Sequence, residues 1–158
     1  MLIILKTLVE AMVAQAQSDH PIETCGVIAG PDGSDLPLRL IPMRNVAKSK
    51  HFFQFDADEQ LRVWKEMEIR GEEPIVLYHS HTQSRAYPSR DDMTFAAEPL
   101  AHYVIIATDP SREQEICSFR IIDGQITEEK LKSVSSYDAH RIGQPFVSKH
   151  GNTTCQLS

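Results

Sequence analysis

Two histidines stand one residue apart near the middle of the chain, His79 and His81, and Asp92 follows eleven residues after the second. Side chains alternate between the two faces of a β-strand, so both imidazoles can converge on one ion, with Ser80 facing away. Three protein ligands of these types with an open fourth position make a catalytic zinc site. The loop before Asp92 is long enough to fold back to the strand end, which makes Asp92 the candidate third ligand.

The same segment also has a purely structural interpretation. Ser89-Arg90-Asp91-Asp92 fits the start of a helix, with Ser89 as the N-cap and acidic residues in the first turn. A serine at a helix start can cap the helix and still direct its hydroxyl at a neighbouring site. His-x-His by itself also occurs in strands that have a polar, solvated face. Both interpretations therefore stay open on this segment alone.

An acidic residue upstream favours catalysis. Glu23 opens the apolar segment 23–30, which can lie beside the strand of His79 and His81 in a sheet. Hydrolysis at a metal needs a base that takes a proton from water and delivers it to the leaving amine. A carboxylate near the metal but not bound to it can do this. The structural alternative for Glu23 is a solvated strand end.

Taken together, these residues resemble the signature of the JAMM (MPN+) metalloproteases. Glu23 lies upstream, His79-Ser80-His81 follows, seven residues separate His81 from Ser89, and two separate Ser89 from Asp92. The resemblance extends from Met1 to about Lys132. The segments most similar to the small bacterial branch of this family are Glu23–Gly30, Ile41–Met43, Tyr78–Thr82, Tyr87–Ser89 and Ile121–Gly124.

The resemblance implies a cytidine-deaminase-like MPN fold and one zinc ion per chain, held by His79, His81 and Asp92. It implies Glu23 as general base and acid, and Ser89 as the residue that stabilises the oxyanion. The small bacterial branch includes enzymes that release cysteine, or a short tail, from the C-terminus of a ubiquitin-like sulfur carrier protein. The implied role is cleavage after the carrier's Gly-Gly, in cysteine or sulfur-metabolite biosynthesis.

Two alternatives of another kind remain beside this peptidase. A non-catalytic MPN scaffold is the first, although such modules typically lose metal ligands and none is lost here. A small-peptide hydrolase that needs no carrier is the second. Thr82 stands where deubiquitinating members usually have proline, which weakens the link to deubiquitination. Cys25 is a further nucleophile candidate, but a small buried residue is the expected role.

The order of the expected elements predicts an α+β fold, with a central, mostly antiparallel sheet flanked by helices. Capping-box spacing starts helices at Thr7–Glu10 and Asp56–Glu59, and Gly71 is the expected stop of the second helix. Leu61, Trp64 and Met67 are expected on its buried face. A third helix is expected over 90–98, and strands over 2–5, 24–30, 38–45, 52–55, 74–81, 102–108, 116–122 and 125–129. His102, Trp64 and the phenylalanines at 52, 53 and 55 are expected in the core.

Length and composition limit the other possibilities. The 158 residues suit one domain over 1–137 with a polar, disordered tail over 138–158. The net charge of −6 argues against nucleic acid, and no apolar run approaches the roughly 18 residues that span a bilayer. The N-terminus lacks the pattern of a signal peptide. Three widely spaced cysteines favour a reducing, cytoplasmic compartment, and the sequence is compatible with a homodimer.

Overall fold

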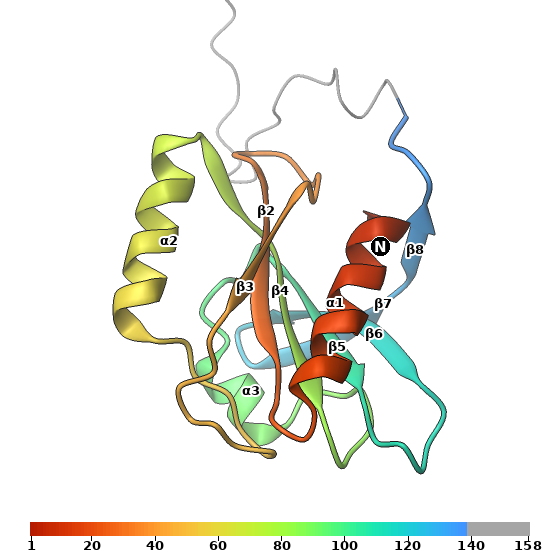
Figure 1. Ribbon diagram of the computed structural model, residues 1–158. Helices are drawn as coiled ribbons and strands as arrows, with labels where there is room; N and C mark the ends of the chain where they lie inside the picture. The colour runs from red at the N-terminus through yellow and green to blue at the C-terminus, as the bar shows by residue number, and fades with distance from the viewer. Residues whose placement is uncertain (139–158) are drawn as a thin grey trace, which may run out of the picture.

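The computed structural model describes residues 1–138, so the tail expected over 138–158 lies, apart from its first residue, outside the described residues. Eleven helices and strands follow one another within this range (Figure 1). They are β1 (Leu2–Leu5), α1 (Lys6–Asp19), β2 (Cys25–Pro31), β3 (Arg39–Met43), α2 (Ala57–Ile69), β4 (Glu72–His81), α3 (Arg90–Phe95), β5 (His102–Ala107), β6 (Glu115–Ile122), β7 (Gln125–Glu129) and β8 (Leu131–Val134).

A six-stranded sheet forms the centre of the fold, in the order β3-β2-β4-β5-β6-β7. Every neighbouring pair is antiparallel except β4 and β5, which run parallel. A separate two-stranded sheet pairs β1 with β8 in parallel. The α+β fold with a mostly antiparallel sheet is therefore confirmed. No helix within residues 1–138 is long and apolar enough to cross a membrane.

The two long helices cover opposite faces of the sheet (Figure 1). Met12 and Ala16 of α1 pack in one apolar cluster with Val76 and Tyr78 of β4. On the other face, α2 packs in a second cluster, and Leu77 contacts that cluster from β4. The apolar run in β4 is therefore buried on both faces. Because side chains alternate, His79 and His81 share the face of Leu77, while Ser80 shares the face of Tyr78.

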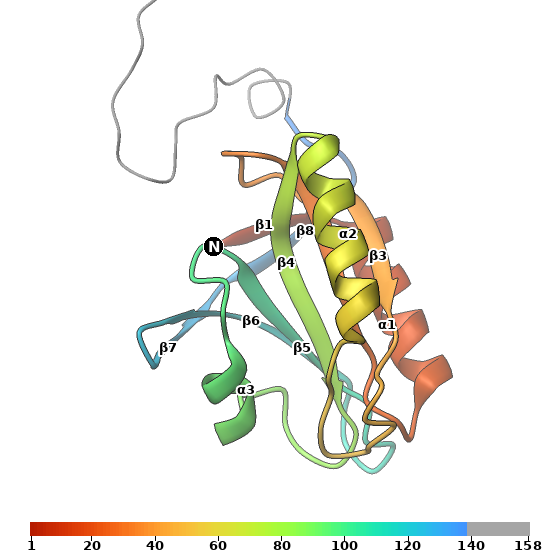
Figure 2. The same cartoon turned by 90° about the vertical axis from the view of Figure 1, so that its left-hand side faces the viewer.

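The end of the sheet where β4 terminates carries the residues of interest. In both views, the carboxyl end of β4, helix α3 and the loop from β3 to α2 lie at this same end (Figures 1 and 2). Glu23 lies here as well, because it stands two residues before β2, which runs antiparallel to β4 and pairs Cys25 with His79. Elements far apart in sequence therefore converge on the strand that carries the two histidines.

Several local predictions are confirmed. Pro21 predicts that the first helix ends before it, and α1 ends at Asp19. Asp56 caps α2, since its side chain accepts a hydrogen bond from the amide of Glu59. Gly71 follows that helix with a φ of 67°, a conformation that favours glycine. Asp123 and Gly124 both have positive φ and join β6 to β7, as their hairpin signal predicts.

Other local predictions are wrong. Helix α1 begins directly after β1 with no side-chain cap, so Thr7 does not form a capping box. Residues 52–55 form no strand, and Phe55 makes only an isolated bridge to Asn45. The buried face of α2 holds Val63 and Met67, while Leu61 is 56% exposed. Helix α3 ends at Phe95, three residues earlier than expected. Strand β8 was not expected, because its four residues form a strand only by pairing with β1.

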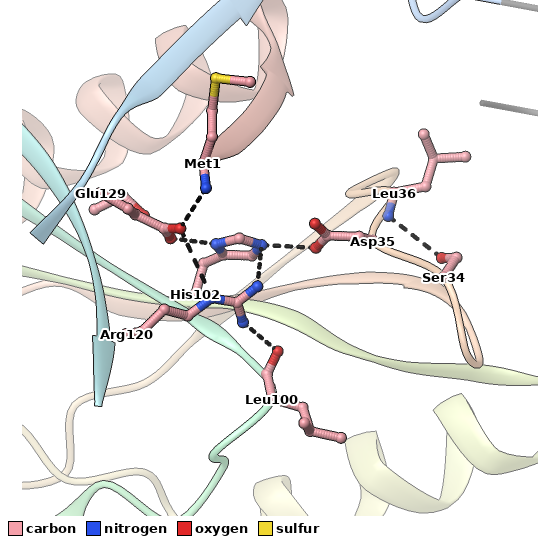
Figure 3. Close-up of polar contacts among 9 residues, drawn as sticks. Met1, Ser34, Asp35, Leu36, Leu100, His102, Arg120 and Glu129 are labelled. Atoms are coloured by element: carbon pink, nitrogen blue, oxygen red, sulfur yellow. Dashed lines mark hydrogen bonds and ion pairs between the residues drawn. The ribbon is translucent and has the colours of Figure 1, made fainter. Parts of the chain in front are cut away.

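A cluster of charged side chains lies at the start of β5, at the end of the sheet away from His79 and His81 (Figure 3). The His102 ring is fully buried and lies between two carboxylates, Glu129 at Nδ1 and Asp35 at Nε2. Glu129 also lies 3.0 Å from the amino group of Met1 and 3.7 Å from the guanidinium of Arg120. The structural role expected for His102 is therefore confirmed, and the cluster joins β1, β5, β6, β7 and the turn before β3.

This cluster predicts a specific dependence of stability on pH. Burial lowers the pKa of His102, but its hydrogen bonds with Asp35 and Glu129 outweigh burial and raise it. A histidine with a raised pKa contributes stability that is complete below about pH 6.5 and is lost as pH rises through the folded pKa. Glu129 has its pKa lowered to about 2, so its contribution is lost only as pH falls below about 4.

We expect His102→Gln to be destabilised by about 2 kcal/mol at pH 6, because the buried Glu129 and the partly exposed Asp35 both lose a charged hydrogen-bond partner. We also expect the wild-type advantage over this variant to shrink as pH rises from 6.5 to 9. Urea unfolding of both proteins across this range measures the difference. Parallel stability curves in the two proteins would show that the ring is not charged in the folded state.

Candidate metal centre

Three ligand atoms meet at the carboxyl end of β4. The Nε2 atoms of His79 and His81 lie 3.1 Å apart, and the carboxylate oxygens of Asp92 lie 3.2 Å from the first and 3.1 Å from the second. Both imidazoles are buried, and the Asp92 side chain is 10% exposed. Within residues 1–138 this is the one group of three such side chains close enough to hold a metal ion. The structure thus brings together the three ligands that the sequence suggested.

The hydrogen bonds around His81 fix which ring nitrogen faces the centre. Its Nδ1 lies 2.8 Å from the carbonyl oxygen of Arg85, which can only accept, so Nδ1 carries the proton and donates it. The other nitrogen, Nε2, is then free to bind a cation through its lone pair. The Phe53 ring stacks on His79 with centroids 4.5 Å apart, which holds that imidazole in place.

Asp92 serves the helix and the centre at once. The amide of Ser89 donates to its Oδ2 at 2.7 Å, and the Ser89 hydroxyl oxygen accepts from the amide of Asp92 at 3.1 Å. This is a complete capping box at the start of α3. The capping interpretation of Ser89 is therefore correct. Its hydroxyl proton has no acceptor among residues 1–138, so it remains available to a ligand.

The charges of the three side chains are those of a cation site. Burial would raise the pKa of Asp92, but hydrogen bonds with His79 and His81 outweigh burial and hold it well below the ordinary range. Burial lowers the pKa of His79. For His81 burial is outweighed by the contacts with Asp92 and the Arg85 carbonyl, which raise its pKa. A carboxylate that stays ionised beside two imidazole nitrogens, at 3.2 and 3.1 Å, favours a cation between them.

The geometry fits a tetrahedral metal. Ligand atoms at about 2.0–2.1 Å from a tetrahedral zinc lie roughly 3.3 Å from one another. The three separations of 3.1–3.2 Å come close to this value with little adjustment of the side chains. Two histidines and one carboxylate also leave a fourth position open. The residues present therefore fit a zinc-type divalent ion, although such a donor set accepts other divalent metals.

Glu23 lies beside the three candidate ligands without joining them. Its side chain is only 4% exposed, and its carboxylate accepts no hydrogen bond from residues 1–138. Burial raises the pKa of Glu23 to about 7; the neighbouring His81 lowers it and Asp92 raises it. This value belongs to the metal-free protein, since a nearby cation favours the carboxylate. Glu23 is therefore a buried, unpaired acid next to the centre rather than a solvated strand end.

Two hydroxyls around the centre were not identified from the sequence. The Ser80 hydroxyl points away from the candidate ligands, as expected, and accepts a hydrogen bond from the amide of Thr24 at 2.8 Å. The Thr82 hydroxyl donates to the carbonyl of Lys50 at 2.8 Å. Both link β4 to segments beside Glu23. For Ser80, its position between the two histidines was the only sequence signal for a role near the centre.

An aromatic groove of about 390 Å³ opens beside His79 and Asp92. Seven aromatic residues line it: Phe52, Phe53, Phe55, Trp64, Tyr78, Phe95 and Tyr103. Phe53, Phe55 and Trp64 also pack against the core under α2, so the core prediction is correct only for their inner faces. No signal in the sequence pointed to this groove, because aromatic residues at 52, 53 and 55 also suit a buried strand.

Cys25 does not resemble a nucleophile. The side chain is fully buried in the cluster under α2. Burial raises the pKa of the Cys25 thiol to about 12, so it stays protonated. The expectation of a small buried residue is confirmed.

Comparisons with known proteins agree with this geometry. The family model described as prokaryotic homologs of the JAB domain (Prok-JAB) matches residues 5–122. The chain is 52% identical over 136 residues to the CysO-cysteine peptidase of Mycobacterium tuberculosis (strain ATCC 25618 / H37Rv), a match that covers 86% of this chain and 93% of that protein. It is 32% identical over 95 residues to the desampylase of Haloferax volcanii, covering 60% of this chain and 68% of that protein.

Solved structures show the same fold. A protein from Desulfitobacterium hafniense, solved in solution, superposes with a TM-score of 0.74 at 30% identity and covers 89% of this chain and 98% of its own. A JAB1/MPN domain protein from Archaeoglobus fulgidus, solved as a crystal structure, superposes with a TM-score of 0.55 at 20% identity, covering 84% and 97%. The fold expected from the resemblance is therefore confirmed.

Proposed function

Because this chain belongs to the family of prokaryotic homologs of the JAB domain, we propose that it is a zinc-dependent peptidase for a small ubiquitin-like sulfur carrier protein. The reaction is hydrolysis of the amide bond after the carrier's C-terminal Gly-Gly, with release of cysteine or a short tail. One observation carries the proposal: the unpaired, buried carboxylate of Glu23 lies beside three side chains arranged to hold a metal.

In this proposal His79, His81 and Asp92 hold the zinc ion. When bound, the metal supplies Lewis-acid chemistry, which polarises the scissile carbonyl and makes water more acidic. Arg85 and Phe53 keep the two imidazoles oriented, through the carbonyl acceptor at His81 and the ring stacked on His79. The capping box holds Asp92 against them.

Glu23 moves the protons. Its carboxylate takes a proton from the attacking water and delivers it to the nitrogen of the leaving amine as the amide bond breaks. Burial supports this double role, because desolvation raises the pKa of Glu23 and so opposes the lowering that a neighbouring cation causes. The absence of a hydrogen-bond partner among residues 1–138 leaves both carboxylate oxygens available to water and substrate.

Ser89 stabilises the developing oxyanion. Its hydroxyl oxygen accepts from the amide of Asp92, which orients the group while leaving the proton to donate. A donor aimed at an oxyanion typically contributes about 3–4 kcal/mol to lowering the barrier.

The aromatic groove supports an extended tail as the substrate. It leads to the metal ligands His79 and Asp92, and its walls are apolar apart from a few polar groups such as Glu98. Glycines beside the scissile bond let the backbone approach the metal closely, since they carry no side chain. The similarity to a CysO-cysteine peptidase and to desampylases supports a small ubiquitin-like protein as the owner of that tail. We also propose a cytoplasmic location; the free thiols of Cys25 and Cys117 are in keeping with a reducing compartment.

The two alternatives have less support. A non-catalytic scaffold does not need an unpaired buried glutamate beside a complete set of metal ligands. A small-peptide hydrolase without a carrier needs the same chemistry, so only substrates separate it from the proposal. We expect a carrier fusion to be cleaved after Gly-Gly much faster than a free peptide with the same last residues. Equal cleavage of the two would favour the small-peptide hydrolase.

Substitutions at Ser89 separate its cap from its catalytic role. Ser89→Ala is expected to lower stability by about 1 kcal/mol and kcat by about 100-fold, with metal still bound. Ser89→Asp is expected to recover stability, because aspartate also caps helices, yet stay inactive because its charge repels the oxyanion. Thermal melts and intact-mass assays measure both effects. An active Ser89→Asp enzyme would show that this serine is only a cap.

A further inference from the structure

The loop between β3 and α2 is organised by one side-chain amide, that of Asn45. Its Nδ2 donates to the carbonyl oxygens of Glu23 and Phe52, both at 3.0 Å. Its Oδ1 accepts from the amides of Ala47 and Gln54, both at 3.1 Å. An asparagine amide has two donors and two acceptor positions, so this side chain uses its full capacity. No other standard side chain of this length offers both.

The first consequence concerns the main chain of Glu23, which the loop holds from both sides. The Glu23 amide donates to the carbonyl of Ser49 at 2.9 Å, and its carbonyl accepts from Asn45. The next amide, that of Thr24, is held by the hydroxyl of Ser80. Glu23 lies outside a regular strand, so these contacts replace the sheet hydrogen bonds that would otherwise fix it.

The second consequence concerns the wall of the aromatic groove. Asn45 holds the carbonyl of Phe52 and the amide of Gln54, the two residues on either side of Phe53. Phe53 stacks on the metal ligand His79, and the Phe52 ring contacts Phe95 across the groove with centroids 5.8 Å apart. The same amide therefore fixes the peptide of the proposed base and the backbone that carries the groove wall.

We propose that Asn45 is a positioning residue for this peptidase. By binding the backbone of both segments, it keeps the carboxylate of Glu23 and the groove wall at Phe52–Phe53 at fixed positions relative to the proposed metal ligands. It touches neither substrate nor metal. The expected effect on catalysis rests on the proposed function. The connection of the Glu23 backbone to the loop rests only on the hydrogen bonds of Asn45. A displacement of about 1 Å of a catalytic group can lower the rate by about 100-fold.

The test uses Asn45→Ala, which removes all four contacts, and Asn45→Ser, whose hydroxyl can replace one donor. Tyr137→Phe is the matched control, because its hydroxyl bonds the amide of Leu5 and the carbonyl of Pro37, away from the metal centre. With zinc content near one per chain, we expect Asn45→Ala to lower kcat at least about 10-fold and to raise KM for the carrier fusion. Asn45→Ser should fall between Asn45→Ala and wild type.

The rise in KM is the readout that a purely structural role would not give, since partial unfolding lowers the active fraction and leaves KM unchanged. Tyr137→Phe should lose stability but keep wild-type kcat and KM below its melting temperature. A kcat and KM for Asn45→Ala that match those of Tyr137→Phe would overturn the proposal.

Amide hydrogen exchange decides the mechanical part without any substrate. We expect the amides of Glu23 and Gln54 to exchange faster in Asn45→Ala and in Asn45→Ser, while that of Val104 in β5 keeps its rate. Unchanged exchange at Glu23 in both variants would overturn the coupling. Failure of the wild-type enzyme to cleave any carrier fusion would contradict the proposed function, and the exchange rates would still decide the coupling of Asn45 to Glu23.

Discussion

Glu23→Gln is expected to remain folded, to keep its metal and to lower kcat by at least about 100-fold. Glutamine has nearly the same shape, and the backbone contacts of this residue with Ser49 and Asn45 do not involve the side chain. The carboxylate is not one of the three proposed metal ligands and accepts no hydrogen bond from residues 1–138, so its loss leaves no partner unsatisfied there. What disappears is the group that takes and returns the proton.

The measurement combines zinc content, a thermal melt and the initial rate of carrier cleavage for wild type and variant. A variant that cleaves at nearly the wild-type rate would show that the proton is handled elsewhere. A variant that loses its zinc would show that Glu23 belongs to the ligand set rather than beside it.

The second large effect concerns the metal. We expect wild-type protein to hold about one zinc per chain, and His81→Ala to lose most of it. The double variant His79→Ala, His81→Ala should hold almost none and be inactive, because only Asp92 remains of the three proposed ligands. The remaining Asp92 would still cap α3, through the backbone contact with Ser89, so the helix is expected to survive.

Metal analysis of protein desalted after purification measures the loss, with His51→Ala as the control for removal of an exposed imidazole. Full zinc retention in the double variant would contradict the assignment of these histidines as ligands. Retention in His51→Ala and loss in the double variant would separate the specific site from general affinity of histidines for zinc.

The features that depend only on neighbouring residues in the sequence, such as strand alternation and helix capping, could be predicted. Strand alternation is sufficient to place His79 and His81 on one face and Ser80 on the other. Capping chemistry is sufficient to start α3 at Ser89 and thereby to bring Asp92 toward the strand end. These two local rules account for most of the geometry of the proposed metal ligands. The loop between His81 and Asp92 is short and is held by the hydrogen bond from His81 Nδ1 to the Arg85 carbonyl.

The features that the sequence did not predict depend on contacts between distant segments. Residues 52–55 have aromatic side chains that suit a strand, yet Asn45 holds them in a loop instead. Strand β8 exists because Leu131–Val134 pairs with a strand more than a hundred residues earlier. The burial of Glu23 likewise depends on the loop that covers it, since its amide bonds Ser49. No periodicity within a short window carries such information.

The central claim is cleavage after the Gly-Gly of a carrier protein by this metal centre. Its most direct test is the intact mass of a purified carrier fusion before and after incubation with the zinc-loaded enzyme. The account predicts that the mass falls by that of the residues following Gly-Gly, leaving a carrier that ends in Gly-Gly, and that Glu23→Gln leaves the fusion unchanged. An unchanged mass with the zinc-loaded wild-type enzyme, or the same product from Glu23→Gln at the same rate, would contradict it.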